Sequence, residues 1–537
     1  MTIAPAVGTG APAPALPRTE GRAERRLVLA AVAGIVALGV AFRFYTRADL
    51  WSDEVLAVNI ARLPLEQLPE ALRRDGAPPL YYLLLGGWIR LMGDKAAAVR
   101  ALSGVIGTLT LVPLWYAGCR LDARRVRLGL QGPGERPVAL ATVVLGASSP
   151  FAIRYATEAR MYALVIALVA VGYLAVWRAW EQPRPSRLAV VAVVAAALCY
   201  THYWAFALGV VVSAVLAWLA LRAPAVADRR RARRLLAALG GAVVLFLPWA
   251  PTLWFQLRRT GTPWADPPGL LAGLGEAFKA FGGNVSVVGW AFLLMVLLAL
   301  FARGVDERHV ELDLWTRPGV RLEIGIALAT LAVGFALAHL SGTTFEGRYA
   351  SVMFPPYLLG AAFAATVFVA RPVRYGVLVL LVLGGFWGGT SNALRNRTQA
   401  FEVVNAIVAE GRPGDVVVYC PDAIGVDVSA QLAERFPGRL REVSLPGPGR
   451  PVRIDWRDYD DRFRRVDPGR VAARLDRLAP DHQVWFVWTP GPARHAGRCD
   501  RVMDALAATR PQPQRPVEPD PYFFEHHGLV RFGPLRR

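Results

Sequence analysis

The 34 residues from Leu188 to Leu221 form an apolar run in which only His202 can carry a charge. A helix needs about 20 residues to cross ~30 Å of hydrocarbon, so this run is too long for one membrane span and just long enough for a tight pair of helices. When this run is divided into two candidate spans, the chain contains eleven apolar segments of roughly the length of a span. They lie at 27–45, 97–119, 138–155, 160–178, 188–203, 204–221, 235–254, 284–302, 322–340, 349–370 and 375–391. The sequence therefore predicts a polytopic α-helical membrane protein with about eleven transmembrane helices.

The distribution of charge supports this fold class. Hydrophobic residues make up 54% of the 537 residues, and the formal net charge is +20. A basic protein can bind nucleic acid, but here the arginines fall in short clusters between apolar runs, as they do in the cytoplasmic loops of membrane proteins. We therefore expect this charge to face a lipid bilayer and expect no nucleic-acid partner.

The same clusters predict a topology. If the eleven runs are spans, five arginine clusters fall on one side, which the positive-inside rule makes cytoplasmic; they lie at 120–136, 178–187, 229–234, 303–321 and 371–374. Residues 1–26, which begin with a stretch rich in Ala, Pro and Gly, are predicted to be a disordered cytoplasmic N-terminus. The transmembrane domain is expected at 27–391, and the segment 392–537 lies outside. These features predict a multi-pass protein of the plasma (inner) membrane.

The first external loop, residues 46–96, contains a short apolar stretch from Pro78 to Ile89. Counting this stretch as a span would place the arginines of 120–136 outside. It begins with Pro-Pro and carries three aromatic residues, a composition that suits a helix lying in the membrane interface. We therefore predict an interfacial helix at 79–92 rather than a span.

The polar segment 392–537 has the pattern of a small extracytoplasmic α/β domain. Helices are predicted at 401–410 and 500–509, strands at 415–419 and 484–488, and a last strand or hairpin at 522–532. Cys420 and Cys499 lie in this segment and can pair if it is extracytoplasmic. The domain carries no nucleotide-binding fingerprint, so a structural or acceptor-docking role is the simplest interpretation.

Two adjacent carboxylates, Asp53 and Glu54, directly follow the first span. Acids without partners just outside the hydrocarbon are costly unless the protein uses them. The predicted topology brings further polar residues to the same side: Glu158, Arg160, His202 and Arg348. This convergence predicts an active site outside the cytoplasm, whereas the simpler interpretation is that these charges mark the ends of spans.

The motifs around these residues resemble a known family. They are Leu50-Trp-Ser-Asp-Glu54, Asp75-Gly-Ala-Pro-Pro-Leu-Tyr-Tyr82, Tyr155-Ala-Thr-Glu-Ala-Arg-Met-Tyr162, Tyr200-Thr-His-Tyr203 and Gly347-Arg-Tyr349. Together they resemble bacterial glycosyltransferase family 39 of the GT-C superfamily, which is similar to protein O-mannosyltransferases and lipid A aminoarabinose transferases. The resemblance extends over roughly residues 27–390. Ala77 departs from the pattern, because relatives often carry His or Lys just before the Pro-Pro pair. Other cations must then hold the lipid phosphate.

The resemblance implies a reaction and a set of roles. The expected reaction moves a mannose- or arabinose-like sugar, with inversion, from a polyprenyl-phosphate donor to an extracytoplasmic acceptor such as a cell-envelope glycan, lipid or protein. Asp53 is then the catalytic base, Glu54 and Glu158 are further catalytic carboxylates, and Asp53 and Glu158 are candidate ligands for a divalent cation. The expected substrate-binding residues are Arg73, Arg74, Tyr81, Tyr82, Arg160, Tyr162, His202, Tyr203, Arg348 and Tyr349.

Two other function classes compete with this one. A transporter or flippase of lipid-linked glycans should show polar residues near mid-span and often an internal repeat. The span centres at 163–176 and 291–300 are almost wholly apolar, and we find no repeat in the sequence. A non-catalytic envelope-assembly subunit, the third class, would require Asp53 to be dispensable. The sequence therefore favours the glycosyltransferase.

Overall fold

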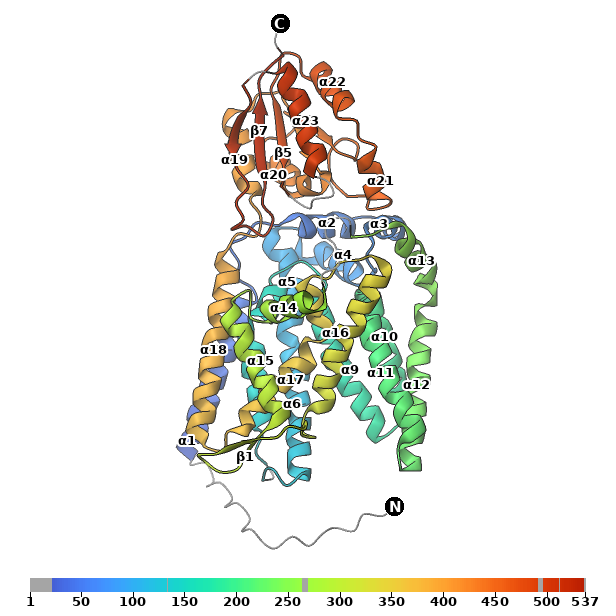
Figure 1. The fold of residues 1–537 in the computed structure, drawn as a ribbon, viewed down its shortest axis with the longest axis vertical. Helices are drawn as coiled ribbons and strands as arrows, with labels where there is room; N and C mark the ends of the chain where they lie inside the picture. Colours follow the sequence, from blue (N-terminus) through green and yellow to red (C-terminus); the bar gives the residue numbers. More distant parts are fainter. Residues whose placement is uncertain (1–21, 133, 263–268, 491–495, 511, 536–537) are drawn as a thin grey trace.

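The computed structural model describes residues 22–132, 134–262, 269–490, 496–510 and 512–535, so most of the predicted disordered N-terminus lies outside it. Figure 1 shows a helical bundle with a smaller part, built around a β-sheet, stacked on one of its ends. The short helices α2 (Ser52–Ala61) and α3 (Leu68–Asp75) lie between these two parts. They come from the predicted first external loop.

The long apolar runs form the bundle. Seven helical segments among the described residues are long and apolar enough to cross a membrane, or up to nine if each of two bent helix pairs is one span. The seven are α1 (Arg22–Phe42), α5 (Ala96–Leu109) continued by α6 (Leu111–Arg127), α9 (Tyr162–Glu181), α11 (Ala205–Arg222), α12 (Val226–Phe246) continued through a 3-10 turn by α13 (Ala250–Arg259), α16 (Arg321–Ser341) and α18 (Arg371–Leu394).

The two bent pairs are α7 with α8 and α14 with α15. The first pair, α7 (Pro137–Ser148) and α8 (Pro150–Ala156), bends by 53° where Pro150 lacks the N–H that would continue the helix. The second pair, α14 (Leu270–Phe281) and α15 (Ser286–Phe301), bends by 101°. The apolar runs in the sequence predict only the α15 part of this pair as a span, and α14 is an additional helix.

Two predicted spans correspond to shorter apolar helices, α10 (Pro185–Thr201) and α17 (Phe354–Ala364). Each of the eleven predicted runs therefore coincides with a helix or a bent pair. The count of eleven spans nevertheless exceeds the seven to nine that length and composition support in the described chain. The run from 188 to 221 breaks at His202, as expected for a tight pair of helices.

The predicted basic loops share the end of the bundle opposite the sheet (Figure 1). Arg371 at the start of α18 lies 3.5 Å from Glu24 and 3.6 Å from Glu135, which joins two of these loops to the start of α1. Arg120 lies 2.7 Å from Glu181 on the same end. One boundary is corrected here: α1 begins at Arg22, so residues 22–26 are helical rather than disordered.

The predicted interfacial helix is present as α4 (Leu80–Met92). It begins directly after Pro78-Pro79 and packs on α2. A Cβ at Gly86 would lie 2.6 Å from the Ala61 carbonyl oxygen, so only glycine permits this close approach. Tyr81 and Tyr82 are buried in the protein core rather than exposed on the helix surface.

The C-terminal part contains a five-stranded sheet in the order β4-β3-β5-β7-β6. Strands β3 (Val416–Cys420), β4 (Arg441–Ser444) and β5 (Val484–Trp488) are parallel, and β7 (Gly528–Phe532) and β6 (Gln514–Val517) add antiparallel pairs. The predicted strands and helices are confirmed as β3, β5, β7, α19 (Ala400–Glu410) and α23 (Ala496–Thr509). The sequence did not reveal β4, β6, α20 (Val426–Arg435), α21 (Tyr459–Arg464) or α22 (Pro468–Leu478). Cys420 and Cys499 form a disulfide.

Helix α2 packs against both parts of the molecule. Eight of its ten residues are buried. Ala57, Val58 and Ile60 belong to the core of the bundle, whereas Val55 and Leu56 belong to the core of the C-terminal sheet. A helix that is buried on opposite faces has little freedom to move, so α2 is a firm support for the residues at its N-terminus.

Candidate active site

Asp53, in the first turn of α2, lies between two arginines from distant parts of the chain. Its Oδ2 is 3.2 Å from Arg348 Nη1 and 3.7 Å from Arg160 Nη2. Arg160 also donates from Nη1 to the Asp53 backbone carbonyl at 3.3 Å. The Asp53 side chain keeps 26% of its surface exposed, twice the 13% of Arg348. The carboxylate is therefore open to solvent while the cations that flank it are sheltered.

The two arginines have hydrogen-bonding capacity to spare. The Nε atoms of Arg160 and Arg348 are buried and have no hydrogen-bond partner among the described residues. Arg160 precedes α9, and Arg348 lies in the 3-10 turn Gly347–Val352, which packs tightly on α14 because a Cβ at Gly347 would lie 2.7 Å from Ala280. Two guanidinium groups around one carboxylate leave a local excess of positive charge, which suits an anionic ligand such as a phosphate.

Aromatic side chains line the site next to these arginines. The His202 ring lies 5.7 Å from the ring of Tyr162 and 5.2 Å from that of Tyr349. The same tip between α10 and α11 carries Tyr203, whose hydroxyl donates to Gln256 and accepts from Trp249 Nε1 at 2.9 Å. Tyr162, His202 and Tyr349 thus gather near Arg348, whereas the hydroxyl of Tyr203 is already occupied by structural hydrogen bonds.

Asp75 is a further carboxylate near this site, and it was not among the site residues predicted from the sequence. Tyr82 donates a hydrogen bond to its Oδ2 at 3.1 Å. Burial raises the pKa of Asp75 to about 6, although the charge of Arg160 opposes this shift. The second predicted tyrosine, Tyr81, shares a hydrogen bond with Ser103 at 3.2 Å. Both tyrosines therefore support the walls of the site through their hydroxyl groups.

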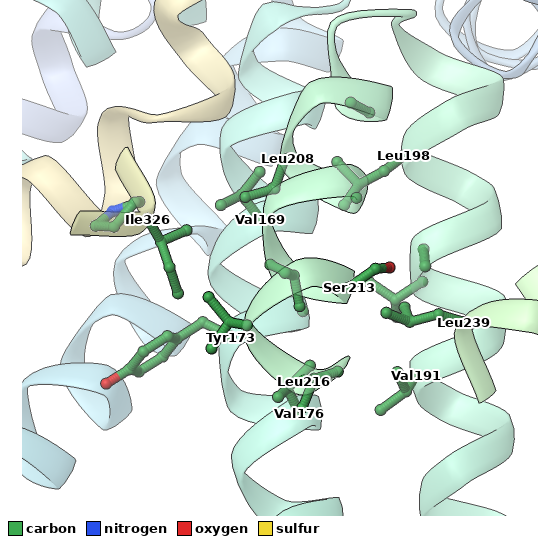
Figure 2. Close-up of a pocket in the computed structure, with 18 of the residues that line it drawn as sticks. Val169, Tyr173, Val176, Val191, Leu198, Leu208, Ser213, Leu216, Leu239 and Ile326 are labelled. Atoms are coloured by element: carbon green, nitrogen blue, oxygen red, sulfur yellow. The ribbon is translucent and has the colours of Figure 1, made fainter. Parts of the chain in front are cut away.

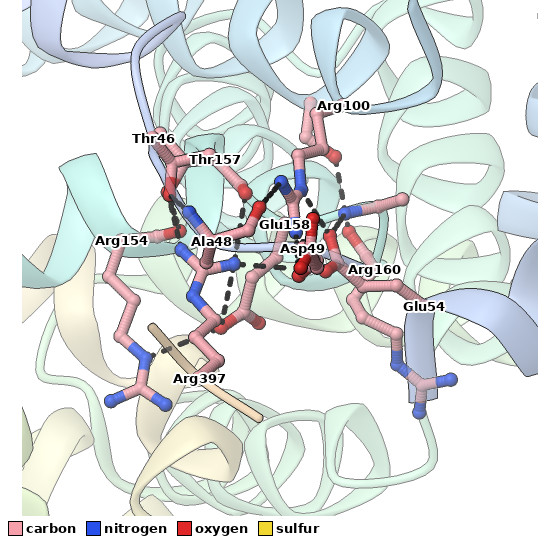
Figure 3. A network of polar contacts seen from close by, with 12 residues as sticks. Thr46, Ala48, Asp49, Glu54, Arg100, Arg154, Thr157, Glu158, Arg160 and Arg397 are labelled. Atoms are coloured by element: carbon pink, nitrogen blue, oxygen red, sulfur yellow. Dashed lines mark hydrogen bonds and ion pairs between the residues drawn. The ribbon is translucent and has the colours of Figure 1, made fainter. Parts of the chain in front are cut away.

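Glu54, the neighbour of Asp53, belongs to a network of polar contacts that includes Arg100 and Arg397 (Figure 3). Arg100 donates to its two oxygens at 2.8 and 2.5 Å, and the Ala159 backbone N–H donates at 2.8 Å. Burial alone would raise the pKa of Glu54, but the charge and hydrogen bonds of Arg100 hold this pKa below its ordinary value. The carboxylate is fully buried, so it is not placed to contact a substrate, contrary to the expectation that it is catalytic.

Glu158 is enclosed in a similar way. It lies 3.3 Å from Arg154 and 3.7 Å from Arg397, and its side chain is 1% exposed. Arg397 also donates to the Thr157 carbonyl and hydroxyl at 3.0 and 2.7 Å. Because Asp53 and Glu158 each face two arginines, they are poor ligands for a divalent cation. The described residues bring three potential metal ligands together in one place, Asp427, Glu525 and His527, and neither predicted ligand belongs to that group.

Arg73 and Arg74 lie away from the site, contrary to the expectation that they bind substrate. The Arg73 guanidinium lies 3.8 Å from the centre of the Phe255 ring, where it makes a cation–π contact. Arg74 pairs with Glu70 at 2.9 Å within α3, and both side chains are about half exposed, at 48% and 47%. The helical spacing of these residues turns them toward α13 and solvent, a direction that their position in the sequence does not reveal.

An apolar cavity of about 630 Å³ lies among helices α6, α9, α10, α11, α12, α16 and α17. Figure 2 shows aliphatic side chains such as Val169, Leu198 and Leu208 lining it. Cys199 and Ala205 also line it, and they flank the tip that carries His202. The cavity therefore reaches residues on either side of His202 and is otherwise lined mostly by apolar side chains of the bundle.

Comparisons with known proteins identify the fold. No family model matches the sequence, and no curated protein matches it. The structure resembles two crystal structures of ArnT from Cupriavidus metallidurans. The apo form matches with a TM-score of 0.54 at 13% identity, and the form bound to undecaprenyl phosphate with a TM-score of 0.51 at 12% identity. Each match covers 94% of this chain and 97% of the ArnT chain. The chain therefore shares the fold of ArnT over nearly its whole length, and this fold agrees with the predicted polytopic α-helical bundle followed by a small α/β domain.

Proposed function

We propose that this protein is a membrane glycosyltransferase that takes a sugar from a polyprenyl-phosphate donor. The observation that carries the proposal is the partly exposed Asp53 between Arg160 and Arg348, with an apolar cavity close by. The shared fold with ArnT, which has been crystallised with undecaprenyl phosphate, supports a lipid of this class. Membership of glycosyltransferase family 39 is part of the proposal.

The donor phosphate would bind to Arg160 and Arg348. Their buried Nε atoms supply donors beyond those that face Asp53, and charge-assisted hydrogen bonds to phosphate are strong. The first part of the polyprenyl tail would follow the apolar cavity past Leu198 and Val169. A lipid donor would account for a charged site and an apolar cavity that reaches the residues flanking His202 in the same molecule.

Asp53 would act as the general base. A phosphate that engages the two arginines competes with Asp53 for their hydrogen bonds, and this leaves the carboxylate oxygens free to face the acceptor hydroxyl. Asp53 then accepts the proton of the acceptor hydroxyl as its oxygen attacks the anomeric carbon, while the bond to the phosphate breaks and the arginines stabilise the leaving anion. Positioned bases of this kind contribute roughly 10²–10⁴-fold to the rate.

The environments of the three predicted carboxylates are consistent with the proposed inversion. A retaining mechanism usually needs a second carboxylate as nucleophile beside the first. Glu54 and Glu158 are enclosed by arginines, so Asp53 is the one of the three that is open to a substrate. This supports a single displacement. Glu54 and Glu158 would position the loops around Asp53, and Arg160 and Arg348 would supply the positive charge that stabilises the phosphate.

The remaining assignments complete the proposal. The sugar would be mannose- or arabinose-like and the acceptor a component of the cell envelope. The end of the bundle that carries the arginine clusters would face the cytoplasm, which places Asp53 and the domain at 392–537 outside the plasma membrane. The Cys420–Cys499 disulfide suits this oxidising side.

A comparison of a deletion strain with its parent tests the function. We expect the deletion strain to accumulate one lipid-linked sugar and to lose the same sugar from one envelope component. The purified protein should then transfer that sugar from the accumulated lipid to the acceptor. Movement of the intact lipid across a vesicle membrane without transfer would instead show a flippase, and unchanged lipids and glycans would contradict the proposal.

Labelling of introduced cysteines tests the topology. A cysteine in place of Arg125 should react only with a reagent that reaches the cytoplasm, and one in place of Arg412 only with an external reagent. Labelling of both positions from the same side would show that the assigned orientation is wrong.

A further inference from the structure

The C-terminal part contacts α2 at the residue directly before Asp53. Ser52 donates from its Oγ to Asp427 Oδ1 at 3.2 Å and from its backbone N–H to Glu525 Oε2 at 3.1 Å. Ser52 is buried, with 5% of its surface exposed. Asp427 lies in α20 and Glu525 precedes β7, so both partners come from the part of the chain that follows the bundle.

The contact to Glu525 replaces a missing helix cap. The first N–H groups of a helix have no partner within the helix and are commonly satisfied by a side chain at the N-cap position. The N-cap residue of α2 is Trp51, and its side chain makes no such bond. Glu525 therefore supplies from another part of the chain an acceptor that the local sequence of α2 does not provide.

His527 contacts the carboxylate of Asp427 and the backbone carbonyl of Glu525. The ring is fully buried, with Nε2 2.9 Å from the Ile424 carbonyl oxygen, Nδ1 3.2 Å from the Glu525 carbonyl oxygen, and Nε2 3.6 Å from Asp427 Oδ1. A ring nitrogen can bond to a carbonyl oxygen only by donating, so this geometry is that of the doubly protonated, cationic ring. Although burial disfavours the charged ring, Asp427 raises the pKa of His527 to about 9.

The three side chains have the composition of a metal site, since their ligand atoms lie within 4.8 Å of one another. Their existing hydrogen bonds argue against this use. Both ring nitrogens of His527 face carbonyl oxygens, and Asp427 already accepts from Ser52, from Thr398 Oγ1 at 2.5 Å and from the Val428 N–H at 2.9 Å. A metal ion would have to displace these partners.

The connection between the two parts of the chain passes through the same place. Glu525 donates its N–H to the Arg397 carbonyl at 2.8 Å and accepts from the Gln399 N–H at 2.9 Å. The Arg397 side chain reaches Glu158 in the bundle, while the next side chain, Thr398, reaches Asp427. Two successive residues of the connection, Arg397 and Thr398, thus contact the bundle and the C-terminal part respectively.

We propose that Asp427, Glu525 and His527, here called the Ser52 clamp, hold the first turn of α2 so that the Asp53 carboxylate stays between Arg160 and Arg348. The clamp residues are positioning residues, because they bind Ser52 and one another rather than a substrate. The proposal rests on the proposed role of Asp53 as the base. It gives the C-terminal part a function in catalysis that neither the sequence nor the fold comparison assigns.

The test uses the full-length protein with two matched pairs of variants. Ser52→Ala removes the hydroxyl that bonds Asp427, and Ser52→Thr retains it. His527→Gln removes the cation from the clamp, and His526→Gln alters the neighbouring, partly exposed histidine as a control. Hydrogen–deuterium exchange of peptides covering residues 52–61 reports on α2 directly. Binding of undecaprenyl phosphate and transfer from the lipid-linked sugar of the deletion strain report on the site.

We expect faster exchange in α2 for His527→Gln and Ser52→Ala, and exchange at the original rate for His526→Gln and Ser52→Thr. A shift of Asp53 by about 1 Å can lower turnover by about 10²-fold. We therefore expect kcat to fall between about tenfold and 10²-fold in the two clamp variants, with the KM for the donor and the affinity for undecaprenyl phosphate within about twofold. A general loss of structure would change all of these quantities together.

Unchanged exchange in α2 with unchanged kcat in both clamp variants would overturn the proposal. A stoichiometric metal ion in the purified protein that is lost in His527→Gln would also overturn it, in favour of a metal site. If His527→Gln fails to fold, Ser52→Ala, which removes a single hydrogen bond, still decides the result. Full activity of Asp53→Asn would contradict the proposed function. It would not affect the test of the Ser52 clamp, because hydrogen–deuterium exchange in α2 is measured without a substrate.

Discussion

Asp53 and Glu54 are adjacent acids on one helix, yet their environments are opposite. Glu54 is fully buried and accepts three hydrogen bonds of 2.8 Å or less, from Arg100 and the Ala159 backbone. Asp53 keeps 26% of its side chain exposed, and its arginine contacts are longer, at 3.2 and 3.7 Å. Successive residues of an α-helix point about 100° apart, so one step along α2 changes a partly exposed position into a core position.

The difference separates a structural ion pair from an exchangeable one. A buried and fully hydrogen-bonded pair is costly to break, because removal of one partner leaves an unpaired charge without water. A partly exposed pair with longer contacts is weak, and its cations can be taken over by a competing anion. On this comparison the Glu54 pair is structural, whereas the Asp53 contacts are of the kind that the proposed reaction needs, because a phosphate could replace Asp53 as the partner of the arginines.

The largest expected effect is that of Asp53→Asn. The amide keeps the size of the side chain but cannot accept the acceptor's proton, so we expect transfer to fall by roughly 10²–10⁴-fold. Expression and undecaprenyl-phosphate binding should stay near wild type, since Arg160 and Arg348 remain. The measurement is transfer of the lipid-linked sugar from the deletion strain. Turnover at the wild-type rate would end the assignment of Asp53 as the base.

Glu54→Gln should act on folding rather than on chemistry. The change leaves the buried Arg100 without its counter-charge, and breaking a buried pair in this way costs about 3–5 kcal/mol. We expect low yield of folded protein and a lowered midpoint of thermal unfolding. Glu70→Gln, at the exposed pair with Arg74, is the matched control and should unfold like the wild type. A stable but inactive Glu54→Gln protein would show that both acids take part in the transfer reaction.

The contrast between these two acids also marks what the sequence could reveal. Adjacent acids at the end of a span are visible in the sequence, and so are the apolar runs that became helices, because both depend on local composition. The rotation of α2 about its axis is not local, since it is set by packing on two cores. Arg397 and Thr157, which meet at 2.7 Å, are 240 residues apart. One signal for the Glu54 ion pair was present in the sequence, because Arg100 is the only charged residue within the predicted span 97–119 and a charge there needs a partner.

The third prediction concerns the cations on the open side of α2. Arg348→Lys keeps the positive charge but loses the planar group that can hold two phosphate oxygens at once. Hydrogen bonds to charged groups contribute about 1.5–3 kcal/mol, so we expect the KM for the lipid donor to rise between about tenfold and 10²-fold. Arg258→Lys, in the exposed last turn of α13, is the control. Equal donor affinity in the two variants would remove Arg348 from the proposed phosphate site.

The smallest expected effect is that of Arg74→Ala, which tests the edge of the site. The sequence pattern suggested Arg74 as a phosphate ligand, but in the structure its guanidinium pairs with Glu70 on the exposed surface of α3. Exposed pairs of this kind contribute about 0–1 kcal/mol, so the KM for the donor should stay within about twofold of wild type. The variant is measured in the same transfer assay as Arg348→Lys. A tenfold rise in KM would mean that α3 turns toward Asp53 when the lipid binds, and Arg74 would then belong with Arg160 and Arg348 among the phosphate ligands.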